Sequence, residues 1–206
     1  MKIIEARGAP NPRRVRIFAA EKGLDIAYQN IDLLAGEHKS AWFQQLNPYG
    51  GVPVLVLDDG AALSETVAIC RYLEALQPEP PLFGREPLEA ARIEMWNRHM
   101  EFSLFRPVAH VFRHTHPRMA ALETPQLPDW AEVNRERAAG GLRLLNDQLA
   151  ENDYVTGDIF TIADITAFVA VGFMKPARME LPEGLDHLAR WYDAVNARES
   201  VAQAGI

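Results

Sequence analysis

The strongest constraint on the fold is an abrupt change of sequence pattern at the run Gln77-Pro78-Glu79-Pro80-Pro81. Prolines at this density cannot continue a helix, so the run predicts an exposed connector. Before it, short apolar runs alternate with helical patterns. From Pro87 onward, strand patterns nearly vanish and apolar residues recur at helical spacing. The sequence therefore predicts a first domain over residues 1–77, a linker over 78–86 and an all-helical domain over 87–206.

The first domain is expected to have the element order βαβαββα. Lys2–Ala6, Ala27–Asp32 and Val54–Leu57 are short runs typical of strands, and Asp58-Asp59-Gly60 predicts a turn into a fourth strand. Between and after the strands, three segments show helical patterns: Asn11–Lys22, Lys39–Gln45 and Ser64–Leu76. Strands that alternate with helices in this way indicate βαβ units and an α/β domain.

The ends of the first predicted helix carry chemical signals. Asn11 is expected to be its N-cap, Pro12 its first helical residue and Gly23 its C-terminal stop. Within it, Val15 and Phe18 are spaced to face a core. We therefore expect a short helix directly after the first strand.

The second domain is expected to be built from helices alone. The apolar-periodic segments are Leu88–Phe112, Trp130–Ala150, Ile162–Phe173 and Gly184–Ala197. Pro107 is expected to kink the first of them, and the proline-rich stretch Pro117–Pro128 predicts an irregular loop. Thr161 lies three residues before Asp164 at the start of an apolar run, which predicts a variant capping box.

Composition narrows the classes of partner. The formal net charge is −7 and the sequence pI is about 5.4, so the chain offers no overall positive field and nucleic acid is not expected as a partner. No apolar run approaches a membrane span, and Met1–Pro10 lacks the apolar core of a secretory signal. The single cysteine, Cys70, cannot form an intramolecular disulfide, which favours a reducing, cytoplasmic location. No metal ion is expected.

The most informative stretch for function is Asn47-Pro48-Tyr49-Gly50-Gly51-Val52-Pro53-Val54-Leu55. A proline at the mouth of an apolar run marks a strand start, an edge or a cis bond in a tight turn, and a trans bond is the commoner state of proline in general. At this place in a βαβαββα order, a cis turn would direct the backbone amide and carbonyl of Val52 outward. Such a pair can hold an extended peptide by strand-like hydrogen bonds.

A second candidate binding element follows at Ser64-Glu65-Thr66-Val67. Hydroxyl and carboxylate groups gather here at a predicted helix start, where free N–H groups and the positive end of the helix dipole lie. Capping by Ser64 explains this pattern without any ligand. The alternative is that Thr66 and its backbone N–H bind a ligand carboxylate while Glu65 meets an ammonium group.

Together these motifs resemble the cytosolic glutathione S-transferases, with features of bacterial theta-like and nu-like members. The likeness rests on the Asn-Pro-x-Gly-x-Val-Pro-Val-Leu run, the Ser-Glu-Thr-x-Ala-Ile helix start, Gly157–Asp164 and Leu188–Tyr192 with Ala197-Arg198. It implies a thioredoxin-like first domain followed by an all-helical domain that forms the electrophile site. It also implies glutathione as co-substrate and a homodimer.

The resemblance assigns roles to individual residues. Val52 would pair with the cysteinyl backbone of glutathione, next to a cis Pro53. Glu65 and Thr66 would hold the γ-glutamyl end. Gly36-Glu37-His38-Lys39 is similar to a stretch of theta-like members whose histidine reaches the glycine carboxylate, which makes His38 and Lys39 candidates, although a solvated loop explains them equally.

Thiol activation is where the sequence departs from the simplest pattern of the family. Serine-using members carry a hydroxyl at the end of the first strand, and Ala9 stands in that position here. Ala9-Pro10-Asn11 is similar to the Thr-Pro-Asn run of other members, which use the asparagine against sulfur. We therefore expect Asn11, the helix start and the charges of Arg13 and Arg14 to stabilise the thiolate, with helix capping as the alternative role of Asn11.

The second substrate is expected to lie against the first long helix of the helical domain. The family places such residues at Phe102, Ser103, Phe105 and Arg106. Arg106 also belongs to a possible cationic stripe with His110 and Arg113 at i, i+4 and i+7, which a solvated face or a subunit contact would explain as well.

The leading hypothesis is a transferase that conjugates glutathione to small alkyl or aryl electrophiles. A glutathione-dependent isomerase, reductase or ether-cleaving enzyme is possible on the same scaffold. A protein that binds glutathione without chemistry, as a carrier or interaction module, is the alternative that Ala9 keeps open.

Overall fold

The computed structural model describes residues 1–205, which divide into two compact units. The first comprises the chain up to Pro81 together with the C-terminal helix α9 (Glu199–Ala204), and the second is Leu82–Arg198. The division falls inside the predicted linker. A thioredoxin-like α/β unit followed by a helical unit is the fold class that the sequence predicts.

The first unit is built on a four-stranded sheet with the strand order β2-β1-β3-β4. Its strands are β1 (Lys2–Glu5), β2 (Ala27–Asn30), β3 (Val54–Val56) and β4 (Ala62–Ser64). β1 pairs with β2 in parallel and with β3 antiparallel, and β3 pairs antiparallel with β4. The sheet is therefore mixed, as the predicted order βαβαββα requires.

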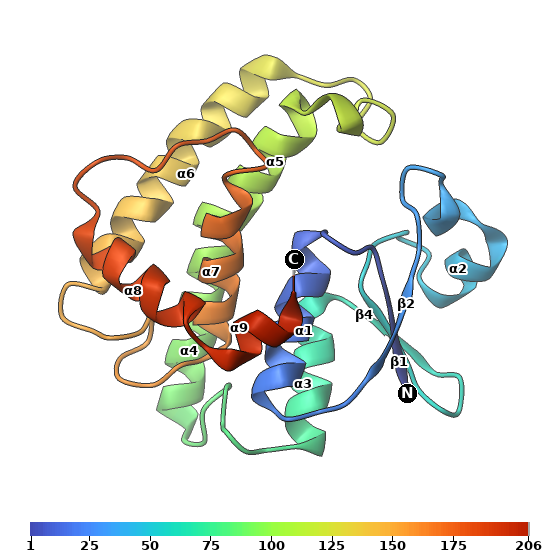
Figure 1. Ribbon diagram of the computed structural model, residues 1–206, viewed down its shortest axis with the longest axis horizontal. Helices are drawn as coiled ribbons and strands as arrows, with labels where there is room; N and C mark the ends of the chain where they lie inside the picture. The colour runs from blue at the N-terminus through green and yellow to red at the C-terminus, as the bar shows by residue number, and fades with distance from the viewer. Residues whose placement is uncertain (206) are drawn as a thin grey trace. The chain divides into compact units, whose positions relative to one another are not determined.

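Helices cover both faces of this sheet. α1 (Pro10–Glu21) and α3 (Thr66–Leu76) lie side by side on one face, and α2 (Ala41–Leu46) lies on the other (Figure 1). Because side chains alternate along a strand, Ile3 and Ile4 point to opposite faces. Ile4 packs with Phe43 and Val54 on the α2 side. The C-terminal helix α9, which the sequence analysis does not predict, packs against α1.

The start of α1 differs from the prediction. The N-cap is Ala9, which makes no side-chain cap hydrogen bond, and the helix begins at Pro10, so Asn11 lies inside the first turn rather than capping it. Proline supplies a fixed helical φ and has no N–H to satisfy, which favours it as the first helical residue. The predicted stop at Gly23 is confirmed, because Gly23 has a φ of +62°.

The second unit contains helices α4 (Pro87–His99), η2 (Met100–Phe105), α5 (Arg106–Thr115), α6 (Pro128–Gln148), α7 (Ile162–Phe173) and α8 (Asp186–Asn196). α5 runs along α6 (Figure 1), and α7 is buried along nearly its whole length. The capping box of Thr161 and Asp164 is confirmed: the Thr161 hydroxyl accepts the Ala163 N–H, and the Asp164 carboxylate accepts the Thr161 N–H.

The predicted kink at Pro107 is a π-helical turn. Pro107 has no N–H to offer the carbonyl of Ser103, four residues earlier. The chain widens over Met100–Phe105, and the Arg106 N–H donates to the Glu101 carbonyl five residues before it. α6 comes so close to this turn that a Cβ on Gly141 would lie 2.3 Å from the Ser103 carbonyl oxygen. Glycine is therefore required at the contact.

Candidate functional site

The strand register brings several candidate segments to one end of the sheet. Ile4 and Ser64 both pair with Val54, from opposite sides. β1 and β4 therefore run towards the end at which β3 begins. The segment after β1, with Asn11, the residues before β3 and the residues after β4 consequently meet at this end.

β2 ends at the same place, because it runs parallel to β1. Asn30 pairs with Glu5, the Ile31 N–H donates to the Glu5 carbonyl, and the Arg7 N–H donates to the Asn30 Oδ1 at 2.7 Å. The loop that follows β2 carries His38. Four sequence segments thus converge at this end of the sheet, although their members lie as far apart in sequence as Ala9 and Thr66.

Val52 presents an unpaired backbone at this end. The peptide bond between Val52 and Pro53 is cis, as the family resemblance implies. Among residues 1–205, neither the N–H nor the carbonyl of Val52 has a hydrogen-bond partner. Val52 is half-buried, and a backbone donor and acceptor left open on one residue form a short stretch of open strand edge, which an extended peptide can join.

Asn47 holds the turn that leads to Val52. Its side chain is 4% exposed, its Nδ2 donates to the Gly51 carbonyl at 2.8 Å, and its Oδ1 accepts the Tyr49 N–H at 3.1 Å. Its own carbonyl accepts the Gly50 N–H at 3.0 Å. Sequence reasoning placed Asn47 in the motif without this role. The signal for it was an asparagine before a Pro-x-Gly turn, since asparagine side chains commonly close such turns.

Glu65 and Thr66 follow β4 with their polar groups open. The structure corrects the predicted helix start, because Ser64 ends β4 and α3 begins at Thr66, with no side-chain cap bond at its start. Thr66 is 6% exposed, and its hydroxyl has no hydrogen-bond partner in the described part of the chain. Capping by Ser64 therefore does not explain why hydroxyl and carboxylate groups gather here.

Glu65 has a backbone conformation rare for its residue type. Its φ is 71° and its ψ is 120°, a region that glycine favours and other residues enter at a cost of about 1–3 kcal/mol. Its carboxylate is exposed and makes no hydrogen bond or ion pair with any residue from 1 to 205. Strain of this kind is found mostly at functional sites, where it places a side chain or a backbone group for a ligand.

His38 and Lys39 lie in the short 3-10 helix η1 (Glu37–Lys39). His38 sits against the turn before Val52, because a Cβ on Gly50 would lie 3.5 Å from the His38 Cδ2. Burial lowers the pKa of His38, and the charge of Lys39 adds to this effect. Its Nδ1 is buried without a hydrogen-bond partner among residues 1–205. The Lys39 side chain is exposed and forms no ion pair with the described residues.

Asn11 lies one residue into α1, next to the end of β1. Its Oδ1 accepts a hydrogen bond from the Arg14 Nη1 at 3.3 Å. Its Nδ2 has no partner within the described chain, so the amide is open as a donor. Pro10 and Pro12 on either side have no N–H. Asn11 is therefore the main source of hydrogen-bond donors at this helix start.

The residues predicted for the second substrate lie on or beside the π-helical turn of the second unit. Phe102 is 54% exposed, and the guanidinium carbons of Arg98 and Arg106 each lie 5.7 Å from the centre of its ring. Phe105 is 5% exposed and belongs to the core. The Ser103 hydroxyl donates to the His99 carbonyl. Of the four residues, Phe102 and Arg106 present open surface, while Ser103 and Phe105 shape the turn.

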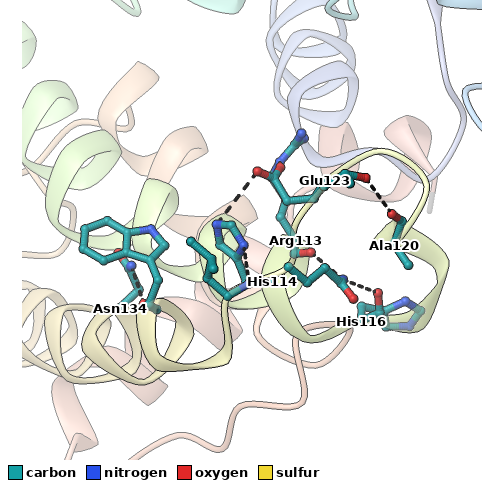
Figure 2. A network of polar contacts seen from close by, with 10 residues as sticks. Arg113, His114, His116, Ala120, Glu123 and Asn134 are labelled. Atoms are coloured by element: carbon teal, nitrogen blue, oxygen red, sulfur yellow. Dashed lines mark hydrogen bonds and ion pairs between the residues drawn. The ribbon is translucent and has the colours of Figure 1, made fainter.

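The predicted cationic stripe is only partly present. Arg113 forms an ion pair with Glu123 in the loop after α5, and His114 faces the same carboxylate at 3.9 Å (Figure 2). His110 stacks on His114 and is half-buried; burial is the first cause that lowers its pKa, with the charge of Arg106 next. Arg106 forms no ion pair with any described residue and is the cation of the stripe that a ligand can reach.

Further hydrogen bonds connect the same loop to α5 and its C-terminal end. Gln126 Nε2 donates to the carbonyls of Arg113 and His116 at 2.7 and 3.0 Å, and the Leu127 N–H donates to the His114 Nδ1 at 3.2 Å (Figure 2). These bonds account for the polar side chains here by structure alone. We assign them no chemistry.

Two further features of the described residues concern membranes and metal ions. No helix within residues 1–205 is long and apolar enough to cross a membrane. Over the same residues, no group of three or more His, Cys, Asp or Glu side chains is placed to hold a metal ion.

Comparison with known proteins gives consistent matches in both units. The glutathione S-transferase N-terminal domain family matches residues 9–76, and the glutathione S-transferase C-terminal domain family matches residues 128–194. Glutathione S-transferase 2 of Saccharomyces cerevisiae is 37% identical over 204 residues, which cover 98% of this chain and 88% of the yeast protein. Elongation factor 1-gamma 2 of rice is 28% identical over 191 residues, covering 90% of this chain but only 43% of the rice protein.

Solved structures agree with these matches. A glutathione S-transferase domain-containing protein of Marinobacter aquaeolei has a TM-score of 0.95 and 42% identity, with 98% of this chain and 100% of the other covered. Gtt2 of Saccharomyces cerevisiae has a TM-score of 0.94 and 37% identity, with 99% and 100% covered. Matches in both units and over nearly the whole chain show that the chain belongs to the glutathione S-transferase family.

Proposed function

We propose that this chain binds glutathione at the described end of the sheet and transfers its thiolate to a small electrophile. The observation that carries the proposal is the set of open polar groups at one sheet end. The Val52 backbone, the Thr66 hydroxyl and the Glu65 carboxylate all lack partners within residues 1–205. Val52 is half-buried and Thr66 is buried, and open polar groups at such positions normally carry a cost, which a bound ligand removes; the exposed Glu65 carboxylate is accessible to the same ligand.

Each part of the tripeptide has a chemically matched group. The cysteinyl backbone pairs with the N–H and carbonyl of Val52, beside Pro53. The γ-glutamyl carboxylate accepts bonds from the Thr66 hydroxyl and N–H at the positive end of α3, and its ammonium meets Glu65. The glycine carboxylate is met by His38 and Lys39, a hydrogen-bonding imidazole and a free cation.

Asn11 is the group we assign to the sulfur. A free thiol titrates near 8.5, and lowering its pKa by about two units requires about 2.7 kcal/mol of preferential binding of the thiolate. A charge-assisted hydrogen bond from the Asn11 Nδ2, with the helix start behind it, is of that order. The cysteine Cys70 has no part in this step, because burial raises its pKa to about 12.

The reaction balances without a further co-reactant. The glutathione thiol releases its proton to water, and the sulfur lone pair forms a bond to the electrophilic carbon. With an aryl halide, the halide leaves with the electron pair of the broken bond. We assign contact with the electrophile to Phe102 and Arg106, which offer an aromatic face and a cation, while Ser103 and Phe105 shape the turn that carries them.

The test combines binding and turnover. Calorimetric titration with glutathione measures the tripeptide site, and an assay with glutathione and an aryl halide measures transfer. Asn11→Ala is expected to bind glutathione within about twofold of the wild type while kcat/KM falls about 10²-fold, which corresponds to the two pKa units above. Asn196→Ala, which changes an exposed asparagine of α8, serves as the matched control. Normal turnover of Asn11→Ala would exclude the assigned role.

A second candidate function is glutathione binding without transfer. It is favoured by Ala9, which leaves no hydroxyl at the end of β1, and by the similarity to a part of rice elongation factor 1-gamma 2. Binding of glutathione without turnover on a broad panel of electrophiles would select this function. Isomerase, reductase or ether-cleaving activity would instead show as turnover on substrates of those classes with none on aryl halides.

We further propose a homodimer in the cytoplasm. The family supports the dimer, and a single buried thiol without a disulfide partner suits a reducing compartment. Light scattering is expected to give twice the mass of 23.1 kDa. A monomeric mass at micromolar concentration would contradict the dimer.

A further inference from the structure

We propose that Arg14 is a positioning residue that turns the amide of Asn11 so that its NH₂ group faces the sulfur. This inference rests on the proposed role of Asn11. Arg14 is 1% exposed, although arginine is rarely buried completely. A buried guanidinium costs desolvation free energy, which its bonded partners offset, and Asn11 is one of these partners.

The contact between the two side chains sets the orientation of the amide. Arg14 Nη1 donates to the Asn11 Oδ1 at 3.3 Å, one helical turn further along α1. A carboxamide has one accepting end and one donating end, so occupation of the oxygen leaves the NH₂ group for other partners. The Nδ2 of Asn11 has no partner among residues 1–205.

A guanidinium enforces this orientation better than other groups. It carries only N–H donors and does not lose its proton, so it can never accept a bond from an NH₂ group. A flipped Asn11 would place its NH₂ against these donors and its oxygen towards the sulfur. An oxygen facing a thiolate would repel it. Arg14 therefore excludes the one rotamer of Asn11 that opposes thiolate formation.

Because of the flanking prolines, the hydrogen bonds that the sulfur can receive depend more strongly on the orientation of the Asn11 amide. Pro10 and Pro12 remove two of the N–H groups that a helix start normally offers to an anion, and the Arg13 N–H is already directed at the Ala9 carbonyl. The donors left at this start belong to Asn11. The orientation of a single side chain thus decides how much hydrogen bonding the sulfur receives.

The test measures the pKa of the bound glutathione thiol, from the ultraviolet absorbance of the thiolate against pH. Arg14→Gln lets the amide rotate and is expected to raise this pKa by about one unit, with an about tenfold lower kcat/KM below the pKa. Arg14→Lys keeps a donor without an acceptor and is expected to limit the loss to about threefold. Glutathione affinity at low pH, where the thiol is protonated in every variant, is expected to stay within about twofold.

Arg16→Gln is the matched control. Arg16 is another guanidinium of α1, but it binds Glu5 and stacks on Tyr28, so its loss removes a charge from the same helix without touching Asn11. Its variant is expected to keep the wild-type thiol pKa. An equal rise in both arginine variants would overturn the positioning role, because it would show a general effect of helix charge or stability.

A double-mutant cycle separates this inference from the proposed function. In an Asn11→Ala background, Arg14→Gln and Arg14→Lys are expected to change the thiol pKa no further, because the side chain through which Arg14 acts is absent. If Arg14→Gln fails to fold, Arg14→Lys carries the same cycle. Equal shifts with and without Asn11 would overturn the positioning role. An Asn11→Ala protein with normal thiol pKa would instead overturn the role of Asn11 itself.

Discussion

Two helices of this chain begin with a hydroxyl and a carboxylate, and they use them in opposite ways. α7 begins after Thr161 with Asp164 in its first turn, and α3 begins at Thr66 after Glu65. At α7, the Asp164 carboxylate accepts bonds from the Val155 and Thr161 N–H groups and from the Trp191 Nε1 at 2.9–3.0 Å. At α3, the hydroxyl and the carboxylate have no partner within residues 1–205.

Residue types alone therefore do not distinguish a structural helix start from one that binds a ligand. The two starts contain the same chemical groups. At α7 they are turned inward and saturated, which contributes to folding. At α3 they are unpaired, and the backbone of Glu65 is strained, which favours a ligand. We call the start of α7 the closed start and the start of α3 the open start. We expect the closed start to determine the stability of the fold and the open start to determine ligand binding.

The largest expected effect is on the closed start. Asp164→Ala leaves three buried N–H donors without an acceptor, and we expect the free energy of unfolding to fall by about 4 kcal/mol or more. Urea denaturation measures this loss. Asp158→Ala, at an exposed aspartate of the preceding loop, is expected to change stability by less than about 0.5 kcal/mol. An equal loss of unfolding free energy in Asp164→Ala and Asp158→Ala would show that the start of α7 has no special role in stability.

The pH dependence of the closed start is the next effect. Burial raises the pKa of Asp164 to about 6, against the donated hydrogen bonds that lower it, while the unfolded chain titrates near 3.8. Between these values the folded state binds more protons, so this group's contribution to stability is fullest below pH 4 and is lost as the pH rises through 6. We expect the stability of the wild type relative to Asp164→Asn to fall by about 2–3 kcal/mol from pH 4 to pH 7.

That difference is measured by urea denaturation of both proteins across the pH range, so that the titration of all other groups cancels. A relative stability that stays constant, or that rises with pH, would contradict a raised pKa at Asp164.

How much of this contrast could be predicted from the sequence differs between the two starts. The capping box is a local pattern of four residues, and the sequence predicted it correctly. The start of α3 was misplaced by two residues, because a glutamate with positive φ carries no local signal; only glycine or asparagine would have announced it. The residues themselves made Val52, Pro53, Glu65 and Thr66 candidates beside structural alternatives, and the resemblance to a known family decided in favour of a binding role.

Features that depend on contacts between residues far apart in the sequence could not be predicted from local sequence patterns. Pro107 predicted a kink, but neither its π-helical form nor the close approach of α6 at Gly141 has a signal in the local pattern. The stripe of Arg106, His110 and Arg113 was read from helical spacing, which does not show that a loop residue, Glu123, neutralises Arg113. The return of α9 to the first unit joins segments at opposite ends of the chain and has no local signature.

On the open start, loss of the Thr66 hydroxyl should affect binding and not folding. Thr66→Val keeps the shape of the side chain, and we expect glutathione affinity to fall about tenfold to thirtyfold, as for a hydrogen bond to a charged group. The free energy of unfolding without ligand should change by less than about 1 kcal/mol. Calorimetric titration measures the glutathione affinity, and urea denaturation measures the free energy of unfolding. A stability loss without an affinity loss would make this start structural, like that of α7.

The smallest expected effect has the opposite sign. Glu65→Gly relieves the strain at a φ of 71°, and we expect the free energy of unfolding to rise by about 0.5–1 kcal/mol while glutathione affinity falls. Glu65→Gln, which keeps the backbone strain and removes the charge, is the control and should change affinity alone. Destabilisation by Glu65→Gly would show that this backbone conformation is not strained.

Binding of the γ-glutamyl end of glutathione by the open start of α3 can be measured by a cycle between protein and ligand. Wild type and Thr66→Val are each titrated by calorimetry with glutathione and with cysteinylglycine, which lacks the γ-glutamyl group. We predict that Thr66→Val weakens binding of glutathione about tenfold or more and leaves binding of cysteinylglycine unchanged. Equal weakening of both ligands, or no binding of glutathione by the wild type, would contradict it.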